Sequence, residues 1–271
     1  MDFSGMNRAA PVLFEREVDS TNLRIRDMAL HGAAEGTILF AAAQTAGRGR
    51  MGRSFLSPPG GLYASLLLHA SEEPARDLTL TPGVAVAVSR AIRRVSGVAC
   101  GIKWPNDLIL QNKKLCGILV ESFMVGAQRA LVVGIGINVN TERFPPSLVT
   151  AISLCQATGA RYALEPLARA LTEELDSFIT AWRADSACVL PDYRRLCLNL
   201  GRTVRLSDGR IGTAVDVDEA FRLLVRFPDG GEEAVSYGEV SVRGLYGYVY
   251  IMVLLPLPSR EAASRGRGVT K

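Results

Sequence analysis

Histidine is scarce in this 271-residue sequence, which contains two histidines, and its five cysteines are not clustered. The cysteines stand at positions 100, 116, 155, 188 and 197, an odd number with wide spacing and no Cys-x-x-Cys pair. A zinc site or a disulfide framework needs closer groupings, so neither is expected. We expect buried, reduced thiols, because an unreactive cysteine packs like a small hydrophobic residue.

A long uninterrupted apolar segment is also missing. Residues 246–257 are apolar, but Gly247 and Pro256 interrupt them, and the run is shorter than the roughly 20 residues of a membrane-spanning helix. Residues 1–11 lack the apolar core of a signal peptide. The sequence therefore predicts a cytoplasmic protein without a membrane association.

Strong charge of one sign is absent as well. The net charge is +4, and the basic residues of 259–271 account for most of it. A broad basic face for non-specific DNA binding is therefore not expected. Hydrophobic residues make up 48% of the chain, which is enough for a substantial core.

The hydrophobic pattern predicts an α+β fold. Strands are predicted at residues 12–18, 37–43, 62–69, 100–103, 108–111, 114–123 and 130–140, and helices at residues 20–32, 81–95 and 165–184. Short connections between the middle strands favour an antiparallel or mixed sheet with helices over alternating βαβ units. After Leu200 the pattern changes to five short strands with glycine turns, which predicts a small β-barrel. We expect a first domain over residues 1–200, the barrel over 201–248, and a disordered tail over 249–271.

The segment of residues 47–53 reads Gly-Arg-Gly-Arg-Met-Gly-Arg and predicts an anion-binding loop. Glycine lets backbone approach a ligand closely, and arginine offers forked cationic donors for phosphate or carboxylate. Its glycine spacing also satisfies the dinucleotide fingerprint, but two prolines and two glycines at 58–61 preclude the helix which that fingerprint requires. A nucleotide-handling enzyme, a nucleic-acid contact and a solvated surface turn all remain open.

Two further segments carry candidate chemistry. Residues 103–107 read Lys-Trp-Pro-Asn-Asp, and Lys114 follows on the facing strand of a predicted hairpin. Asp107 and Lys114 together can bind a metal ion and a phosphate, although a surface pair in an ordinary turn has the same pattern. Gly134 and Gly136 alternate along a strand, where they make room either for a flat ligand or for a close strand crossing.

Four ordered blocks together resemble the catalytic domain of biotin protein ligases. The blocks are Gly-Arg-Gly-Arg-x-Gly-Arg at 47–53, Lys-Trp-Pro-Asn-Asp at 103–107, Lys-Leu-x-Gly-Ile-Leu-Val-Glu at 114–121 and Gly-Ile-Gly-Ile-Asn-Val at 134–139. The resemblance extends upstream to Ser20-Thr21-Asn22 and downstream to the small barrel. It implies a class II synthetase-like fold with an SH3-like barrel, and a reaction in which biotin and ATP, with Mg²⁺, give biotinyl-5'-AMP before biotin passes to a lysine of a biotin carboxyl carrier protein.

The resemblance also implies roles for individual residues. The residues implied in biotin binding are Ser20, Thr21, Asn22, Gln44, Gly47, Arg48, Gly49, Arg50, Lys114, Leu119, Gly134 and Gly136. Those implied in ATP binding are Arg48, Arg50, Arg53, Phe55, Lys103, Asn106, Lys114 and Asn138. Lys114, Arg50 and Asp107 are the expected catalytic residues, with Asp107 also the candidate Mg²⁺ ligand, and the 47–53 loop is expected to be a mobile lid.

The sequence departs from many relatives in two ways. About a dozen residues precede the first predicted strand, so an N-terminal DNA-binding domain is not expected, whereas a homodimer remains open. Phe55 stands where a tryptophan is common in the family. The alternatives are a lipoate or octanoate ligase of the same superfamily and a non-enzymatic nucleic-acid-binding module.

Overall fold

A seven-stranded mixed sheet forms the centre of the computed structural model, which describes residues 1–236 and 241–242. In spatial order the strands are β1 (Val12–Glu15), β2 (Ile38–Ala41), β3 (Leu62–His69), β7 (Gln128–Ile137), β6 (Lys113–Val125), β5 (Asp107–Leu110) and β4 (Gly101–Lys103). Only β1 and β2 run parallel, and every other neighbouring pair is antiparallel. The predicted mixed sheet and α+β class are therefore confirmed.

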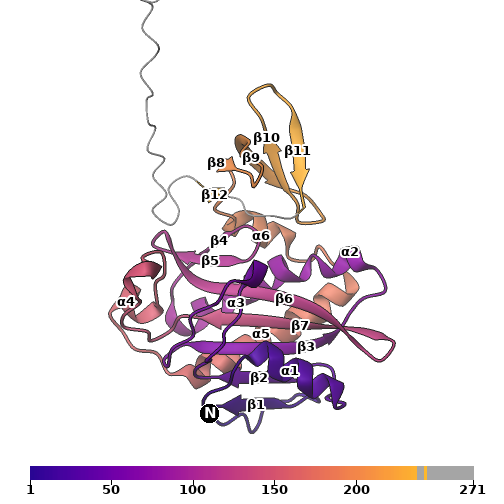
Figure 1. Ribbon diagram of the computed structural model, residues 1–271, viewed down its shortest axis with the longest axis vertical. Coiled ribbons are helices and arrows are strands. Elements are labelled where there is room, and N and C mark those ends of the chain that lie inside the picture. Colours follow the sequence, from indigo (N-terminus) through magenta and orange to yellow (C-terminus); the bar gives the residue numbers. More distant parts are fainter. Residues whose placement is uncertain (237–240, 243–271) are drawn as a thin grey trace, which may run out of the picture.

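Helices cover both faces of this sheet (Figure 1). Helix α1 (Thr21–Leu30) lies on one face, where its Ile25 packs with Leu39 and Leu67 of the central strands. The larger core lies on the other face, beneath α3 (Leu80–Ser96), α5 (Leu164–Ala184) and α6 (Leu190–Leu196). Because β3 is covered on both faces, its apolar run is continuous instead of alternating.

The two long helices α3 and α5 approach each other closely. The apolar positions predicted for α5, among them Leu167, Leu171 and Phe178, are buried as expected from their helical spacing. A Cβ atom at Gly83 of α3 would lie 2.1 Å from the Phe178 ring, so only glycine permits this contact. The Trp182 indole donates a hydrogen bond of 2.7 Å to the Thr79 hydroxyl and joins the same helices at their ends.

A second sheet of five antiparallel strands lies beyond the β4 edge of the first (Figure 1). Its spatial order is β11 (Glu232–Val235), β10 (Leu223–Arg226), β9 (Ile211–Val217), β8 (Thr203–Arg205) and β12 (Ser241–Val242). The last strand returns to pair with the first, as in a small SH3-like barrel. The remainder of the predicted 201–248 barrel, and the whole tail at 249–271, fall outside the described residues.

The two sheets share one core. The Trp104 indole, at the β4 end of the large sheet, donates a hydrogen bond of 2.8 Å to the Phe221 carbonyl. The Phe221 ring meets Tyr193 of α6 edge-on at 5.3 Å between centroids. The small sheet is thus anchored where the Lys-Trp-Pro-Asn-Asp segment turns.

Several short elements were missing from the sequence prediction. They are α2 (Pro74–Asp77), α4 (Leu154–Thr158) and the 3-10 turns at Arg50–Gly52 and Pro146–Leu148, together with α6. Each spans too few residues to display a helical hydrophobic period. None of the helices in the part of the chain that the structure describes has the length and apolar character needed to traverse a bilayer.

Candidate active site

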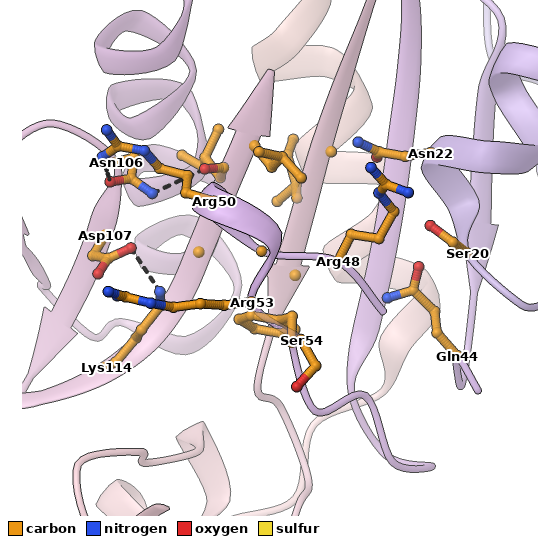
Figure 2. Close-up of a pocket in the computed structure, with 18 of the residues that line it drawn as sticks. Ser20, Asn22, Gln44, Arg48, Arg50, Arg53, Ser54, Asn106, Asp107 and Lys114 are labelled. Carbon is orange, nitrogen blue, oxygen red and sulfur yellow. Dashed lines mark hydrogen bonds and ion pairs between the residues drawn. The ribbon is translucent and has the colours of Figure 1, made fainter. Parts of the chain in front are cut away.

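A cavity of about 380 Å³ opens on the α1 side of the large sheet, beside the first turn of that helix. Every residue predicted for the site lines it except Gly47 and Asn138. Figure 2 shows hydroxyl and amide side chains, including Ser20, Asn22 and Gln44, at one end, where the charge of Arg48 is paired with Glu121, and the cationic Arg50, Arg53 and Lys114 at the other. We call these the neutral end and the cationic end. The cavity therefore suits a ligand with an uncharged polar head and an anionic tail.

The glycine and arginine segment folds back on itself over the cavity. Gly49 N–H donates 2.7 Å to the Arg53 carbonyl, and Phe55 N–H donates 2.9 Å to the Gly47 carbonyl. Arg48 and Ser54 form an antiparallel bridge between these two bonds. At the tip, the exposed Met51 has a positive φ of 57° and Gly52 one of 73°. The segment is a short hairpin instead of the opening of a helix, which agrees with rejecting the dinucleotide fingerprint.

A hydrogen-bonded cluster organises the neutral end. The Gln44 Oε1 atom accepts from the backbone N–H of Thr21 at 2.8 Å and from its hydroxyl at 3.0 Å, while the Gln44 amide donates to Ser57 at 2.8 Å. Ser65, which is completely buried on β3, lies below this pair with its hydroxyl 2.8 Å from Thr21 Oγ1 and 2.6 Å from Asn22 Oδ1. These contacts restrict the orientations of the Thr21, Asn22 and Gln44 side chains.

The cationic end is built on the hairpin of β5 and β6. Lys114 Nζ lies 2.7 Å from Asp107 Oδ1, and it is also 5.7 Å from the centre of the Phe55 ring. Arg50 Nη1 donates 2.9 Å to Asn106 Oδ1, which ties the arginine loop to the turn before β5. The side chains that can neutralise an anion thus converge from three separate segments.

A β-bulge sets the direction of Lys114. Leu108 pairs with Cys116, but the next residue, Ile109, pairs with Lys114, so Leu115 is extra on β6. Strict alternation would place Lys114 on the same face as Cys116 and Ile118, both of which are buried in the larger core. The bulge turns the lysine to the cavity side, a common use of bulges beside functional sites.

The two strand glycines accommodate protein side chains. A Cβ at Gly134 would lie 2.2 Å from Asn22 Oδ1, and a Cβ at Gly136 would lie 2.6 Å from the Phe55 ring. The sequence had suggested that these glycines leave room for a ligand or for a strand crossing. In the structure they leave room for two side chains that themselves line the cavity.

Gly47 and Asn138, which were also predicted for the site, do not line the cavity. Gly47 is buried at the base of the loop, where a Cβ would lie 2.3 Å from the Phe55 carbonyl. The Asn138 amide donates 3.1 Å to the Ile152 carbonyl and 3.4 Å to the Lys114 carbonyl, and the residue is 3% exposed. Both therefore shape the backbone around the cavity instead of facing it.

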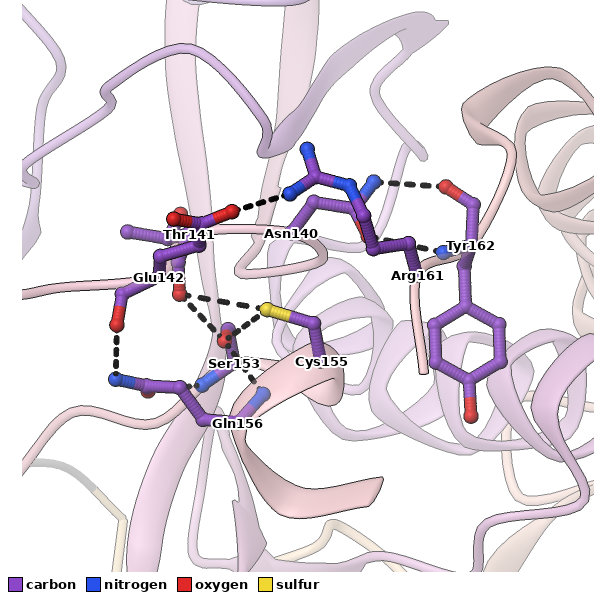
Figure 3. Close-up of polar contacts among 8 residues, drawn as sticks. All are labelled: Asn140, Thr141, Glu142, Ser153, Cys155, Gln156, Arg161 and Tyr162. Atoms are coloured by element: carbon purple, nitrogen blue, oxygen red, sulfur yellow. Dashed lines mark hydrogen bonds and ion pairs between the residues drawn. The ribbon is translucent and has the colours of Figure 1, made fainter. Parts of the chain in front are cut away.

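Sequence reasoning missed the segment that follows β7, whose Leu148 and Thr150 line the cavity. The Lys114 N–H donates 2.7 Å to the Thr150 carbonyl, so this segment runs beside the bulge. Figure 3 shows how its far side is fixed: Ser153 caps α4 and donates 2.7 Å to the Thr141 carbonyl, and Asn140 exchanges two hydrogen bonds with Tyr162. The segment has no motif of its own, so only its tertiary pairing reveals its role.

Cysteine chemistry and a preformed metal centre find no support at the site. Burial raises the pKa of the Cys116 thiol well above its usual range, and it also raises the pKa of Cys100 and, to about 11, that of Cys197. These thiols stay protonated at neutral pH and are poor nucleophiles. Within residues 1–236 and 241–242, no three His, Cys, Asp or Glu side chains gather in a manner that could hold a metal ion.

Similarity to known proteins agrees with this geometry. The model of the Biotin/lipoate A/B protein ligase family matches residues 13–138. The chain is 34% identical over 236 residues to the biotin--[acetyl-CoA-carboxylase] ligase of Mycobacterium tuberculosis, covering 83% of this chain and 86% of that protein. It is 32% identical over 234 residues to the bifunctional ligase/repressor BirA of Escherichia coli, covering 83% and 72%. The chain spans about half the length of the BirA of Bacillus subtilis, with 39% identity over 155 residues, covering 55% and 48%.

Solved structures give the same result. A biotin protein ligase from Aquifex aeolicus in complex with biotin and ATP superposes with a TM-score of 0.75 at 30% identity, covering 86% of this chain and 98% of that one. A biotin protein ligase from Leishmania major in complex with biotinyl-5-AMP gives a TM-score of 0.55 at 28% identity, covering 83% and 98%.

Proposed function

The chain belongs to the biotin protein ligase family, and from this premise we propose that it activates biotin with ATP and transfers the biotinyl group to a carrier-protein lysine. The observation that carries the proposal is the two-ended cavity, in which a neutral hydrogen-bonding end and a cationic end lie under one arginine-rich loop. The neutral end matches the uncharged ureido head of biotin. The cationic end matches the carboxylate and phosphates that must meet.

In the first step, a carboxylate oxygen of biotin attacks the α-phosphorus of ATP. The new oxygen–phosphorus bond forms as the bond to the β-phosphate bridge breaks, and pyrophosphate leaves. Both reactants are anions, so their approach is costly unless cations neutralise the charge that gathers between them. We assign this role to Arg50, Arg53 and Lys114, with Asp107 holding Lys114 in place through the 2.7 Å ion pair.

In the second step, the neutral amine of a carrier lysine attacks the acyl carbon, an amide bond forms as the acyl carbon–oxygen bond breaks, AMP leaves with the electron pair, and the amine gives up one proton to the solvent. Water competes for the same acyl carbon, so a covered cavity favours transfer over hydrolysis. The arginine loop, which reaches Asn106 through Arg50, supplies that cover.

Mg²⁺ fits this site as an ion that arrives with the nucleotide. Asp107 provides one carboxylate beside the cationic end, and Mg²⁺ is commonly held by one or two carboxylates together with substrate phosphates. When bound, the ion would screen the negative charge of the phosphates.

The other assignments extend this proposal. We propose that residues 1–200 form the catalytic domain and that the small sheet after it closes the β4 side, with a biotin carboxyl carrier protein of acetyl-CoA carboxylase or a related carboxylase as the acceptor. Cytoplasmic location and homodimer formation stay predictions. The named biotin--[acetyl-CoA-carboxylase] ligase of M. tuberculosis supports the choice of acceptor.

Exchange of labelled pyrophosphate into ATP tests the activation step. We expect exchange with biotin and Mg²⁺, and none with lipoate or octanoate, because a dithiolane ring or a methyl end leaves Thr21 and Gln44 without new partners. Exchange driven by lipoate or octanoate would instead identify a ligase for those acids. Salt-dependent DNA binding with no exchange for any acid would favour a nucleic-acid-binding module.

A further inference from the structure

A carboxylate to which the sequence assigned no role lies between the neutral end and the arginine loop. One oxygen of Glu121, on β6, accepts 2.7 Å from the Asn22 amide, and the other accepts 2.9 Å from Arg48 Nη2. The Glu121 side chain is 33% exposed and that of Arg48 is 48% exposed, so the pair sits at the mouth of the cavity. Figure 2 shows Arg48 on the Asn22 side, away from Lys114.

The carboxylate is anchored from below. Asn22 donates to Glu121 and accepts 2.6 Å from Ser65, which is completely buried. Gly134, opposite Ser65 on β7, provides the space that Asn22 needs. Because each member is fixed by the one beneath it, Glu121 presents its second oxygen to the loop in a defined place.

We propose that Glu121 is a positioning residue that holds Arg48, and with it the arginine loop, closed over the neutral end. This inference deepens the proposed function, because the closed loop is the state that retains biotin and its adenylate. It divides the work among the loop arginines: Arg48 is a latch whose charge Glu121 offsets, whereas Arg50 and Arg53 serve the anions. The resemblance had assigned Arg48 to both biotin and ATP.

The latch is also connected to occupancy of the cavity. The Thr21 backbone N–H and hydroxyl both donate to Gln44 Oε1, and the Thr21 hydroxyl also contacts Ser65, which donates to Asn22. A ligand head that bonds to Thr21 or Gln44 competes for these donors and acceptors. Binding of a ligand at the neutral end therefore changes the hydrogen bond from Asn22 to Glu121, and through it the ion pair between Glu121 and Arg48.

A double-mutant cycle tests the latch in the full chain. The variants are Glu121→Ala, Arg48→Ala and their combination, read by the dissociation rate of biotin and by hydrogen exchange at residues 47–55 in the free protein. We expect each single change to speed release and exchange about tenfold, and the combination to do no more than either alone, since both remove one interaction. Glu121→Gln keeps an acceptor for Asn22 but loses the charge, so about a threefold effect is expected, reduced further by salt.

Glu142→Ala is the matched control. It removes an ion pair with Arg161 that is also carboxylate to guanidinium (Figure 3), but at 71% and 67% exposure, and neither residue lines the cavity. We expect wild-type release and exchange from this variant. Additive effects in the cycle, wild-type behaviour of Glu121→Gln, or an equal effect of Glu142→Ala would each overturn the latch.

The two readouts separate the latch from the proposed function. Loop exchange in the free protein depends on no ligand, so non-additive acceleration there supports the latch even if the wild-type chain fails to exchange pyrophosphate with biotin. Conversely, normal biotin-dependent pyrophosphate exchange with no coupling between Glu121 and Arg48 overturns the latch and leaves the proposed function intact.

Discussion

At the residue scale, Asn22 determines more of the cavity than its neighbours do. It meets a hydroxyl below, a carboxylate above and a bare backbone at Gly134 beside it, so it has a single orientation. An asparagine can donate and accept at once, and both capacities are used here. Glycine is therefore required at position 134 of β7 because Asn22 of α1 occupies the space that a larger side chain would need.

Gly134→Ala should show this dependence. The new Cβ would lie 2.2 Å from Asn22 Oδ1, so the amide must move, and we expect a stability loss of about 1–3 kcal/mol with biotin affinity about tenfold weaker. Chemical denaturation and biotin titration measure the two effects. In an Asn22→Ala background, where the clashing atom is gone, the same glycine change should cost little stability. An equal cost in both backgrounds would contradict this account.

At the element scale, the arginine loop is a hairpin that contacts the rest of the protein through side chains on either side, Arg48 and Arg50. Its own backbone bonds close it from Gly47 to Phe55, Arg48 reaches Glu121, and Arg50 reaches Asn106. Its tip at Met51 is 74% exposed and has a positive φ, so side-chain contacts such as these two help to hold the loop over the cavity.

Arg50→Gly should weaken retention of the adenylate. The change removes the charge-assisted hydrogen bond to Asn106, and glycine gives the loop backbone more conformational freedom. We therefore expect the adenylate to dissociate about 10 to 100 times faster. Released adenylate acylates lysines at random, which streptavidin blotting of a bystander protein detects. Met51→Asn, at the exposed tip, should keep labelling confined to the carrier. Carrier-only labelling by Arg50→Gly would show that Arg50 does not retain the intermediate.

The elements also show what a sequence can and cannot predict here. The arginine loop, the Lys-Trp-Pro-Asn-Asp turn and the long helices were predictable, because local composition or helical period determines them. The direction of Lys114 was not, since it depends on a bulge at Leu115 that only strand pairing reveals. Glu121 was overlooked for the same reason: its partners Asn22 and Arg48 are 99 and 73 residues away in the chain.

At the scale of the whole molecule, the two sheets are joined by a shared hydrophobic core. Val217 of β9 and Phe221 of the β9–β10 connection join the same buried cluster as side chains of α5 and β7. Arg194 of α6 adds bonds to the Val217 carbonyl at 2.8 Å and to Asp216 at 3.0 Å. Such continuity favours cooperative unfolding.

Trp104→Phe tests this coupling. The change leaves the Phe221 carbonyl without its indole donor, so a stability loss of about 1–3 kcal/mol is expected. Fluorescence of Trp182 reports the large sheet and far-ultraviolet circular dichroism reports both, and their denaturation midpoints should shift together. Arg226→Ala, which breaks an exposed ion pair on the small sheet, should change stability by less than about 0.5 kcal/mol. Two separate transitions in the Trp104 variant would mean that the sheets unfold independently.

Strand β6 contains both Lys114 at the cationic end and Glu121 beside Arg48, so the length of strand between them sets the distance between the two ends of the cavity. A strand advances about 3.3 Å per residue, and a single inserted residue turns every later side chain to the opposite face. Lys114 and Glu121 are an odd number of residues apart and share a face only through the bulge at Leu115, so without a further bulge the separation between the two ends can change only in steps of two residues, about 7 Å. Ligands that differ by one or two methylene groups must be distinguished by the loops that border the cavity, because the strand cannot be adjusted so finely.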